Sequence, residues 1–204
     1  MPDLFVSKTP LSGASQKPDY KNSASMLSSF CENPANISFQ HQHPNEDIVL
    51  FLRSHFITNL PWIITGIFLV LLPLAIPFIM PFLNLDFFSA SKNLTIIALL
   101  FYYLVVFSFT LINFMTWFYN IFIVTKERVI DIDYSNVVIH NVAETKMSHI
   151  QDVNYTQTGF IHSLFNYGDV FVQTAGNEVN FEALSVPNPR EAVKIIASLI
   201  GKQK

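Results

Sequence analysis

Residues 60–83 are LPWIITGIFLVLLPLAIPFIMPFL, a run without a single charged side chain. At 1.5 Å per residue, a helix of this length covers about 36 Å, against a bilayer hydrocarbon core of about 30 Å. Pro73, Pro77 and Pro81 recur at every fourth position in the second half of the run, and each removes a backbone donor and favours a bend. The stretch therefore predicts a membrane-spanning helix that is bent by its prolines.

A second apolar run follows after a short polar break. It extends from Leu94 to Val124 and would be about 46 Å long as a helix, which exceeds the thickness of the hydrocarbon core. We therefore expect its last turns to leave the membrane and the span itself to cover about residues 94–120. Residues 59–124 together are predicted to form a two-helix transmembrane hairpin.

Side chains typical of the membrane–water interface mark one end of both predicted spans. Six of them are predicted to be membrane-interface anchors: Arg53, Trp62, Trp117, Tyr119, Lys126 and Arg128. The three basic anchors lie outside the hairpin, whereas Lys92 is the one basic residue between the spans. Because positive charge is retained on the cytoplasmic side, this distribution predicts that both termini are cytoplasmic.

The segments before the hairpin differ from it sharply. Residues 1–44 are rich in Ser, Pro, Asn and Gln and poor in long aliphatic side chains, which predicts a disordered polar tail. Residues 45–58 are predicted to be an amphipathic juxtamembrane segment, for which either a short surface helix or a strand is possible. Cys31 is the only cysteine, so no intramolecular disulfide can form.

The hydrophobic pattern changes to alternation after the second run. Ile130, Ile132 and Tyr134 alternate with Asp131 and Asp133, and similar short runs recur around residues 153–156 and 170–174. Period-two alternation bounded by turn residues is typical of half-buried strands. Residues 121–204 are therefore predicted to be a small antiparallel β domain.

The last part of this domain carries the local pattern of a helix start. Asn188 is a favourable N-cap, Pro189 suits the first helical position, and Glu191 stands three residues after the cap. An apolar stripe follows over residues 192–200, which predicts a helix packed on the sheet.

Four stretches in this order resemble the bacterial membrane proteins that carry a PH-like (pleckstrin-homology-like) domain after two transmembrane helices. They are YNIFIVTKERVIDID (119–133), HIQDVNY (149–155), LFNYGDVFVQTAG (164–176) and VPNPREAVKIIASLI (186–200). The resemblance implies an α+β membrane protein of the bacterial cytoplasmic membrane, with a transmembrane hairpin followed by a cytoplasmic PH-like domain. That domain is expected to be a seven-stranded antiparallel β-barrel capped by the C-terminal helix.

The resemblance implies a fold and a location but no reaction. Many eukaryotic PH domains bind phosphoinositides through several basic residues in the first strand pair, where this chain offers only Lys126 and Arg128 beside acidic neighbours. Specific phosphoinositide binding is therefore not expected. The net charge of −3 also argues against nucleic acid as a partner.

Histidines are the main candidates for chemistry, but their pattern is not characteristic. His41, His43 and His55 lack the spacing of a metal site. His140, His149 and His162 lie near carboxylates in the β domain, without a nucleophile motif beside them. No catalytic, metal-binding or cofactor-binding residue is predicted, and no cofactor is expected.

Asn113 is the one polar side chain of the second span that suggests an interaction. An amide in hydrocarbon needs a hydrogen bond, which Asn113 could find either across a helix–helix contact or at a preceding carbonyl of its own helix. The main functional hypothesis is a non-enzymatic membrane-anchored scaffold that binds the bilayer and a protein partner or its own copies. The alternatives are an oligomeric pore or transporter-accessory subunit and, less favoured, a membrane enzyme.

Overall fold

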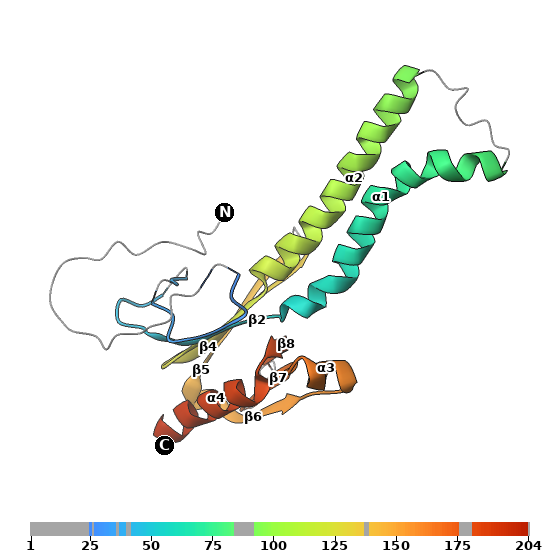
Figure 1. Cartoon of the computed structure of the whole chain (residues 1–204). Helices are drawn as coiled ribbons and strands as arrows, with labels where there is room; N and C mark the ends of the chain where they lie inside the picture. The colour runs from blue at the N-terminus through green and yellow to red at the C-terminus, as the bar shows by residue number, and fades with distance from the viewer. Residues whose placement is uncertain are drawn as a thin grey trace. The chain divides into compact units, whose positions relative to one another are not determined.

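The computed structural model describes residues 25, 27–35, 37–39, 42–83, 92–136, 139–175 and 181–203. The chain forms two compact units, each described here by itself (Figure 1). One unit, which we call the sheet unit, joins the residues up to His55 with those from Phe118 onward. The other, the helical unit, is the segment Phe56–Trp117 between them.

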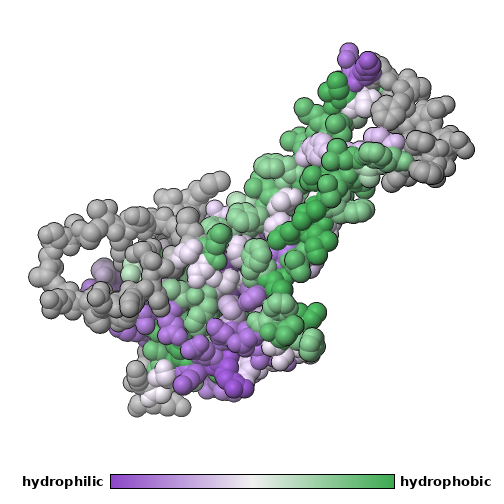
Figure 2. All heavy atoms as spheres, in the orientation of Figure 1, coloured by the Kyte–Doolittle hydropathy of each residue, from purple (hydrophilic) through white to green (hydrophobic). Residues whose placement is uncertain are grey.

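The helical unit consists of a short 3-10 helix and two long helices. These are η1 (Phe56–Asn59), α1 (Leu60–Leu83) and α2 (Lys92–Tyr119). The helical unit ends at Trp117, so the last two residues of α2 belong to the sheet unit. Two stretches, Phe56–Phe78 and Lys92–Tyr119, are long and apolar enough to cross a membrane, and their surfaces are largely hydrophobic in Figure 2. Figure 1 shows that α1 bends in its second half, where its three prolines recur.

Tyrosine hydroxyls hold α1 and α2 together. Tyr102 donates to the carbonyl of Leu69 at 2.7 Å, and Tyr103 donates to that of Val70 at 3.3 Å. A Cβ atom added to Gly66 of α1 would meet the hydroxyl of Thr110 in α2 at 3.4 Å. The two helices therefore approach closely where a side chain is missing, as is common between membrane helices.

The larger sheet of the sheet unit combines strands from both sides of the helical unit. Its order is β1 (Phe30–Glu32), β2 (Ile48–Arg53), β3 (Ile121–Thr125), β4 (Arg128–Asn136) and β5 (Ile139–Lys146), and all neighbours are antiparallel. Arg53 at the end of β2 is opposite Ile121 at the start of β3. The strands directly before and after the helices therefore pair with each other.

The smaller sheet is antiparallel and has the order β6 (Ile150–Thr156), β7 (Tyr167–Thr174) and β8 (Phe181–Pro187). The turn η3 (Met147–His149) precedes it, and the short helix α3 (Phe160–Leu164) joins β6 to β7. The last helix, α4 (Pro189–Gln203), packs on β6, β7 and η3. It begins at the proline after Asn188, as the capping pattern predicted.

The expected closed barrel is wrong, because the strands form two sheets that do not close. Among the described strands, β5 does not pair with β6 and β8 does not pair with β2. At the corner where β2 ends, Ser54 Oγ donates to the Leu184 carbonyl at 2.9 Å, and the His55 N–H donates to the Ser185 carbonyl at 2.7 Å. The remaining opening between the sheets is a groove, described below.

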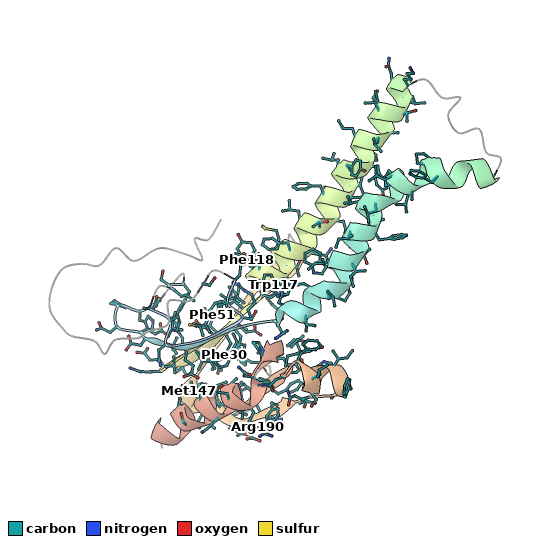
Figure 3. The ribbon with its side chains drawn as sticks, in the orientation of Figure 1. Phe30, Phe51, Trp117, Phe118, Met147 and Arg190 are labelled. Carbon is teal, nitrogen blue, oxygen red and sulfur yellow. The ribbon has the colours of Figure 1, made fainter. Side chains whose placement is uncertain are left out.

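The sheet unit buries apolar side chains on both faces of its larger sheet. One cluster fills the space between the two sheets and α4, and includes Leu52, Val124, Met147 and Ile196; Met147 is labelled in Figure 3. The other covers the opposite face and comprises Cys31, Ile37, Phe39, Ile48, Phe51, Ile121, Ile123, Ile130 and Ile132. Burial on both faces explains why the β3 sequence IFIVT is continuously apolar.

This second cluster corrects the prediction for the N-terminal segment. Residues 30–32 form a strand, and Ile37 and Phe39 are buried, so the predicted disordered tail over 1–44 is wrong for these residues; residues 1–24 lie outside the described part. Within 45–58, the strand β2 is present at residues 48–53 in place of a surface helix. The apolar side chains of β2 are buried on both sheet faces, which a surface helix would not achieve.

Candidate functional site

The opening between the two sheets is a groove of about 620 Å³. Its lining combines apolar side chains with three carboxylates, two amides and one guanidinium, namely Asp131, Asp133, Glu182, Asn120, Asn141 and Arg53; because carboxylates are in excess, we call it the acidic groove. Asp131 and Asp133 come from β4 and Glu182 from β8. The two sheets therefore bring together carboxylates that lie about fifty positions apart in the sequence.

Asp131 has the most unusual environment in the acidic groove. It lies opposite Phe122 of β3 and Ala143 of β5, on the sheet face that packs toward the smaller sheet. Burial, together with repulsion from Asp133 and Glu182, raises the pKa of Asp131 to about 7. The alternating pattern placed Asp131 on a solvent face, and no local signal indicated that β8 would face it.

Replacing Asp131 by asparagine is expected to stabilise the protein at alkaline pH. Since the folded-state pKa lies above the ordinary value of 3.8 for an aspartate, the folded state binds more protons than the unfolded state, and wild-type stability should fall as pH rises from about 4 to about 7. Partial solvent access reduces the cost of ionising Asp131 in the folded state. The Asp131→Asn variant should therefore gain about 1–2 kcal/mol in free energy of unfolding at pH 8 and little at pH 4. Thermal unfolding in detergent across this pH range measures it.

The matched control is Asp133→Asn, because Asp133 is exposed on the same strand. This change should give a smaller gain, through the repulsion it removes from Asp131. An Asp131→Asn variant with the same pH dependence as the wild type would contradict the assignment.

Arg53 is held inside the sheet unit. Its side chain is fully buried, with its guanidinium carbon 4.6 Å from the centroid of the Phe118 ring and 5.4 Å from that of Phe51; both rings are labelled in Figure 3. Burial lowers the pKa of Arg53 to about 10, so it is still a cation at neutral pH. Its role as a membrane-interface anchor stays a prediction. The structure adds that the side chain is packed against two aromatic rings.

Arg128 is the centre of an ion-pair network. It bonds Glu46 at 2.9 Å and Glu144 at 2.7 Å, and Thr125 Oγ1 donates to Glu46 at 2.8 Å. Burial favours the neutral form of Glu46, but the hydrogen bonds from Arg128, the His43 N–H and Thr125 outweigh it and lower the pKa of Glu46. These contacts tie the segment before β2 to the β3–β4 turn.

Lys126, the other basic residue of this turn, pairs with Asp47 at 3.0 Å, and both side chains are about half exposed. The two cations that could face a lipid phosphate are therefore engaged by carboxylates of the chain itself. The absence of specific phosphoinositide binding stays a prediction.

The aromatic anchors have partners within their own units. Trp62 Nε1 donates to Asn59 Oδ1 at 3.1 Å, and the Trp117 ring lies edge-on to Phe56 at 6.1 Å. The Tyr119 ring packs on Tyr134 at 5.2 Å. These contacts fix the rings, and their place at a membrane interface stays a prediction.

Asn113 donates to the carbonyl of Phe109 in its own helix at 2.8 Å. Of the two alternatives considered for this amide, the structure shows the intrahelical bond. A contact with a second copy of the chain stays a prediction.

The described histidines fall into two groups. The rings of His55 and His162 both pack on Tyr167, at 5.3 Å and 4.4 Å. His43 and His149 line one pocket together with Glu127, Arg128 and Glu144. His43 lies 3.3 Å from Glu127, whereas His41 and the side chain of His140 are outside the described residues. Over the part of the chain that the structure describes, no group of three or more His, Cys, Asp or Glu is placed to hold a metal ion.

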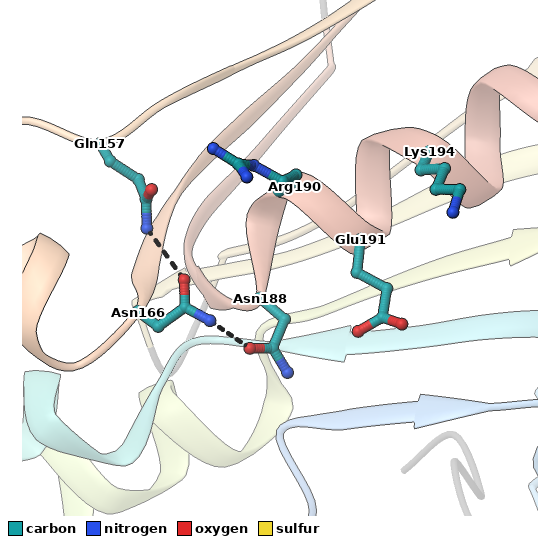
Figure 4. Close-up of a pocket in the computed structure, with 6 residues that line it drawn as sticks. All are labelled: Gln157, Asn166, Asn188, Arg190, Glu191 and Lys194. Atoms are coloured by element: carbon teal, nitrogen blue, oxygen red, sulfur yellow. Dashed lines mark hydrogen bonds between the residues drawn. The ribbon is translucent and has the colours of Figure 1, made fainter.

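A second, polar pocket of about 480 Å³ lies at the start of α4 (Figure 4). Asn166 Nδ2 donates to Asn188 Oδ1 at 2.6 Å, and the Asn188 N–H donates to the Asn166 carbonyl at 2.9 Å. Both asparagines have positive φ, 50° and 49°, which asparagine tolerates better than most residues. Their reciprocal bonds fasten α4 to the start of β7, so the pocket has a structural explanation.

These features define a class of protein: a mixed α/β sheet unit that carries a groove and is interrupted by two helices apolar enough to cross a membrane. The chain belongs to the bacterial PH domain family, whose sequence model matches residues 55–200. The match includes both long helices and β3 to α4, and it leaves out β1 and β2. Comparisons with curated proteins and with solved structures gave no match.

Proposed function

We propose that this protein is a membrane-anchored scaffold, in which the two long helices span the bacterial cytoplasmic membrane and the sheet unit binds a protein partner or its own copies at the cytoplasmic face. Membership of the bacterial PH domain family supports an interaction or scaffolding module. Two helices of sufficient length and hydropathy support the anchor.

The observation that carries the proposal is the pairing of β2 with β3. Ile48–Arg53 lies antiparallel to Ile121–Thr125, and the two long helices are the connection between these strands. Strands that pair must be in the same compartment, so the first span must start on the side on which the second ends. The pairing supports a hairpin with both termini on one side, and Arg53, Lys126 and Arg128 favour the cytoplasmic side.

The placement of polar groups supports binding rather than catalysis. His43 and His149 share one pocket, where Arg128 is ion-paired with Glu144. Asp152 and Asp169 accept hydrogen bonds from the N–H groups of Val153 and Ser185. Within the described residues we find no observation that favours the pore or the enzyme over the scaffold, and Asn113 donates one hydrogen bond within its own helix.

Affinity capture from native membranes tests the scaffold. The tagged full-length chain is extracted in a mild detergent, the mass of the complex is measured by native mass spectrometry, and an unrelated two-span protein from the same membranes serves as the control. We expect either a complex of two or more copies or a protein that the control does not capture. A monomer without a specific protein would overturn the proposal.

A further inference from the structure

Four large apolar side chains are exposed together on and beside α3. They are Phe160, Ile161, Leu164 and Phe165, with 79%, 56%, 62% and 44% of their surfaces exposed; we call them the α3 patch. Figure 2 shows a hydrophobic surface where α3 lies in Figure 1, next to the hydrophilic surface over α4. Exposed clusters of this kind mark a contact surface rather than ordinary solvated residues.

The sequence around α3 has a glycine before the helix and no charged residue. Gly159 precedes the helix with a φ of 102°, which side chains rarely adopt. The segment 159–168, GFIHSLFNYG, contains no Asp, Glu, Lys or Arg. The segment that forms the patch is therefore uncharged, and the nearest charged side chains on its α4 side are those of the pocket beside Asn166.

The α3 patch lies close to the point where the chain leaves the sheet unit for its first long helix. Within the sheet unit, the His162 ring of α3 packs on Tyr167 at 4.4 Å, and the other neighbour of Tyr167 is the His55 ring at 5.3 Å. His55 is the residue directly before the candidate span Phe56–Phe78. Along the chain, the candidate span therefore starts directly after a residue that shares the Tyr167 ring with α3.

β8 has a further exposed apolar side chain next to the end of β2. Leu184 is 55% exposed, and its carbonyl accepts the hydrogen bond from Ser54. Asp169 accepts the Ser185 N–H at 2.7 Å, and the Ser185 carbonyl in turn accepts from His55. Burial lowers the pKa of His55, which favours the neutral form of its ring.

We propose that the α3 patch is a third membrane contact, seated in the lipid interface beside the start of the first span. The proposal rests on the proposed membrane anchor, and it adds a surface that would fix the orientation of the sheet unit on the bilayer. The occupant is lipid rather than a protein partner, because the patch is uncharged and adjoins the residue from which the span begins.

Fluorescent labels at single cysteines test the contact. In the full-length chain carrying Cys31→Ala, a polarity-sensitive dye is attached at Phe160→Cys or Leu164→Cys, and the protein is reconstituted in vesicles of phosphatidylethanolamine and phosphatidylglycerol. Phe107→Cys on α2 reports on the span, and Ser198→Cys, exposed on α4, reports on water. We expect the α3 labels to be quenched by brominated lipid, with iodide quenching roughly threefold weaker than at position 198.

The controls separate the two proposals. Labels at 160 and 164 that behave like the label at 198, while the label at 107 is quenched by brominated lipid, would overturn the α3 contact and leave the anchor intact. A label at 107 that also stays in water would overturn the anchor and the α3 contact together.

A photoreactive amino acid at Leu164, in a chain that retains Cys31, provides a second measurement without the cysteine background. Adducts with phospholipid in native membranes support the proposal. Adducts with protein alone, or none at all, overturn it.

Discussion

Replacing Arg128 by methionine is expected to lower the free energy of unfolding of the sheet unit by about 2–3 kcal/mol at pH 7. The change leaves the Glu46 carboxylate, whose side chain is 0% exposed, without its cationic partner. Methionine retains much of the arginine's apolar volume, so the loss reports mainly on the charge. Urea denaturation of the detergent-solubilised protein, followed by circular dichroism, measures it.

Lys126→Met is a matched control, because Lys126 lies two residues away and pairs with the neighbour of Glu46, Asp47, at the exposed surface. This variant should lose about 0–1 kcal/mol. The loss in Arg128→Met should also shrink at acid pH, since the unpaired Glu46 becomes neutral there. A double variant with Glu46→Gln should recover part of the stability. Equal losses in Arg128→Met and Lys126→Met would contradict the internal network.

Replacing Gly168 by alanine is expected to destabilise the sheet unit by about 2–4 kcal/mol. An added Cβ would lie 2.5 Å from the backbone oxygen of Thr156 in β6 and 2.7 Å from Cγ of Gln157. It would also lie 3.3 Å from Cγ of Pro189, the first residue of α4. Because the nearest obstacle is backbone, β7 must move away from β6 to accommodate the methyl group. The same denaturation measurement applies.

Gly201→Ala provides the comparison for this substitution. A Cβ at Gly201 in α4 would meet nothing within 4 Å, so alanine there should be neutral or stabilise by up to about 1 kcal/mol. A Gly168→Ala variant as stable as the wild type would show that β6 and β7 can separate enough to accommodate the methyl group without loss of stability.

Local patterns predicted those parts of the fold that local chemistry determines. The uncharged runs became α1 and α2, the alternation at 130–134 became β4, and Asn188 followed by Pro189 marked the start of α4. Each of these depends on residues within a few positions of one another.

Pairings across the helical unit could not be predicted in this way. β2 pairs with β3, which follows both long helices in the sequence. Arg128 donates a hydrogen bond to Glu46, which lies 82 positions away. The raised pKa of Asp131 depends on Glu182, which reaches the groove from the other sheet. α3 left a readable signal, since FIHSLF is a short apolar run after a glycine and lacks the alternation of its neighbours.

The pairing of β2 with β3 also sets an order of assembly during synthesis. β2 leaves the ribosome before either long helix, whereas β3 follows both. Until then β2 lacks its β3 partner, and its apolar side chains lack the cover of both sheet faces. The larger sheet can therefore form in full only after both long helices have been made. A chain truncated within the helices would leave the β3 edge of β2 unpaired, and such an open edge is a site for aggregation and for quality control.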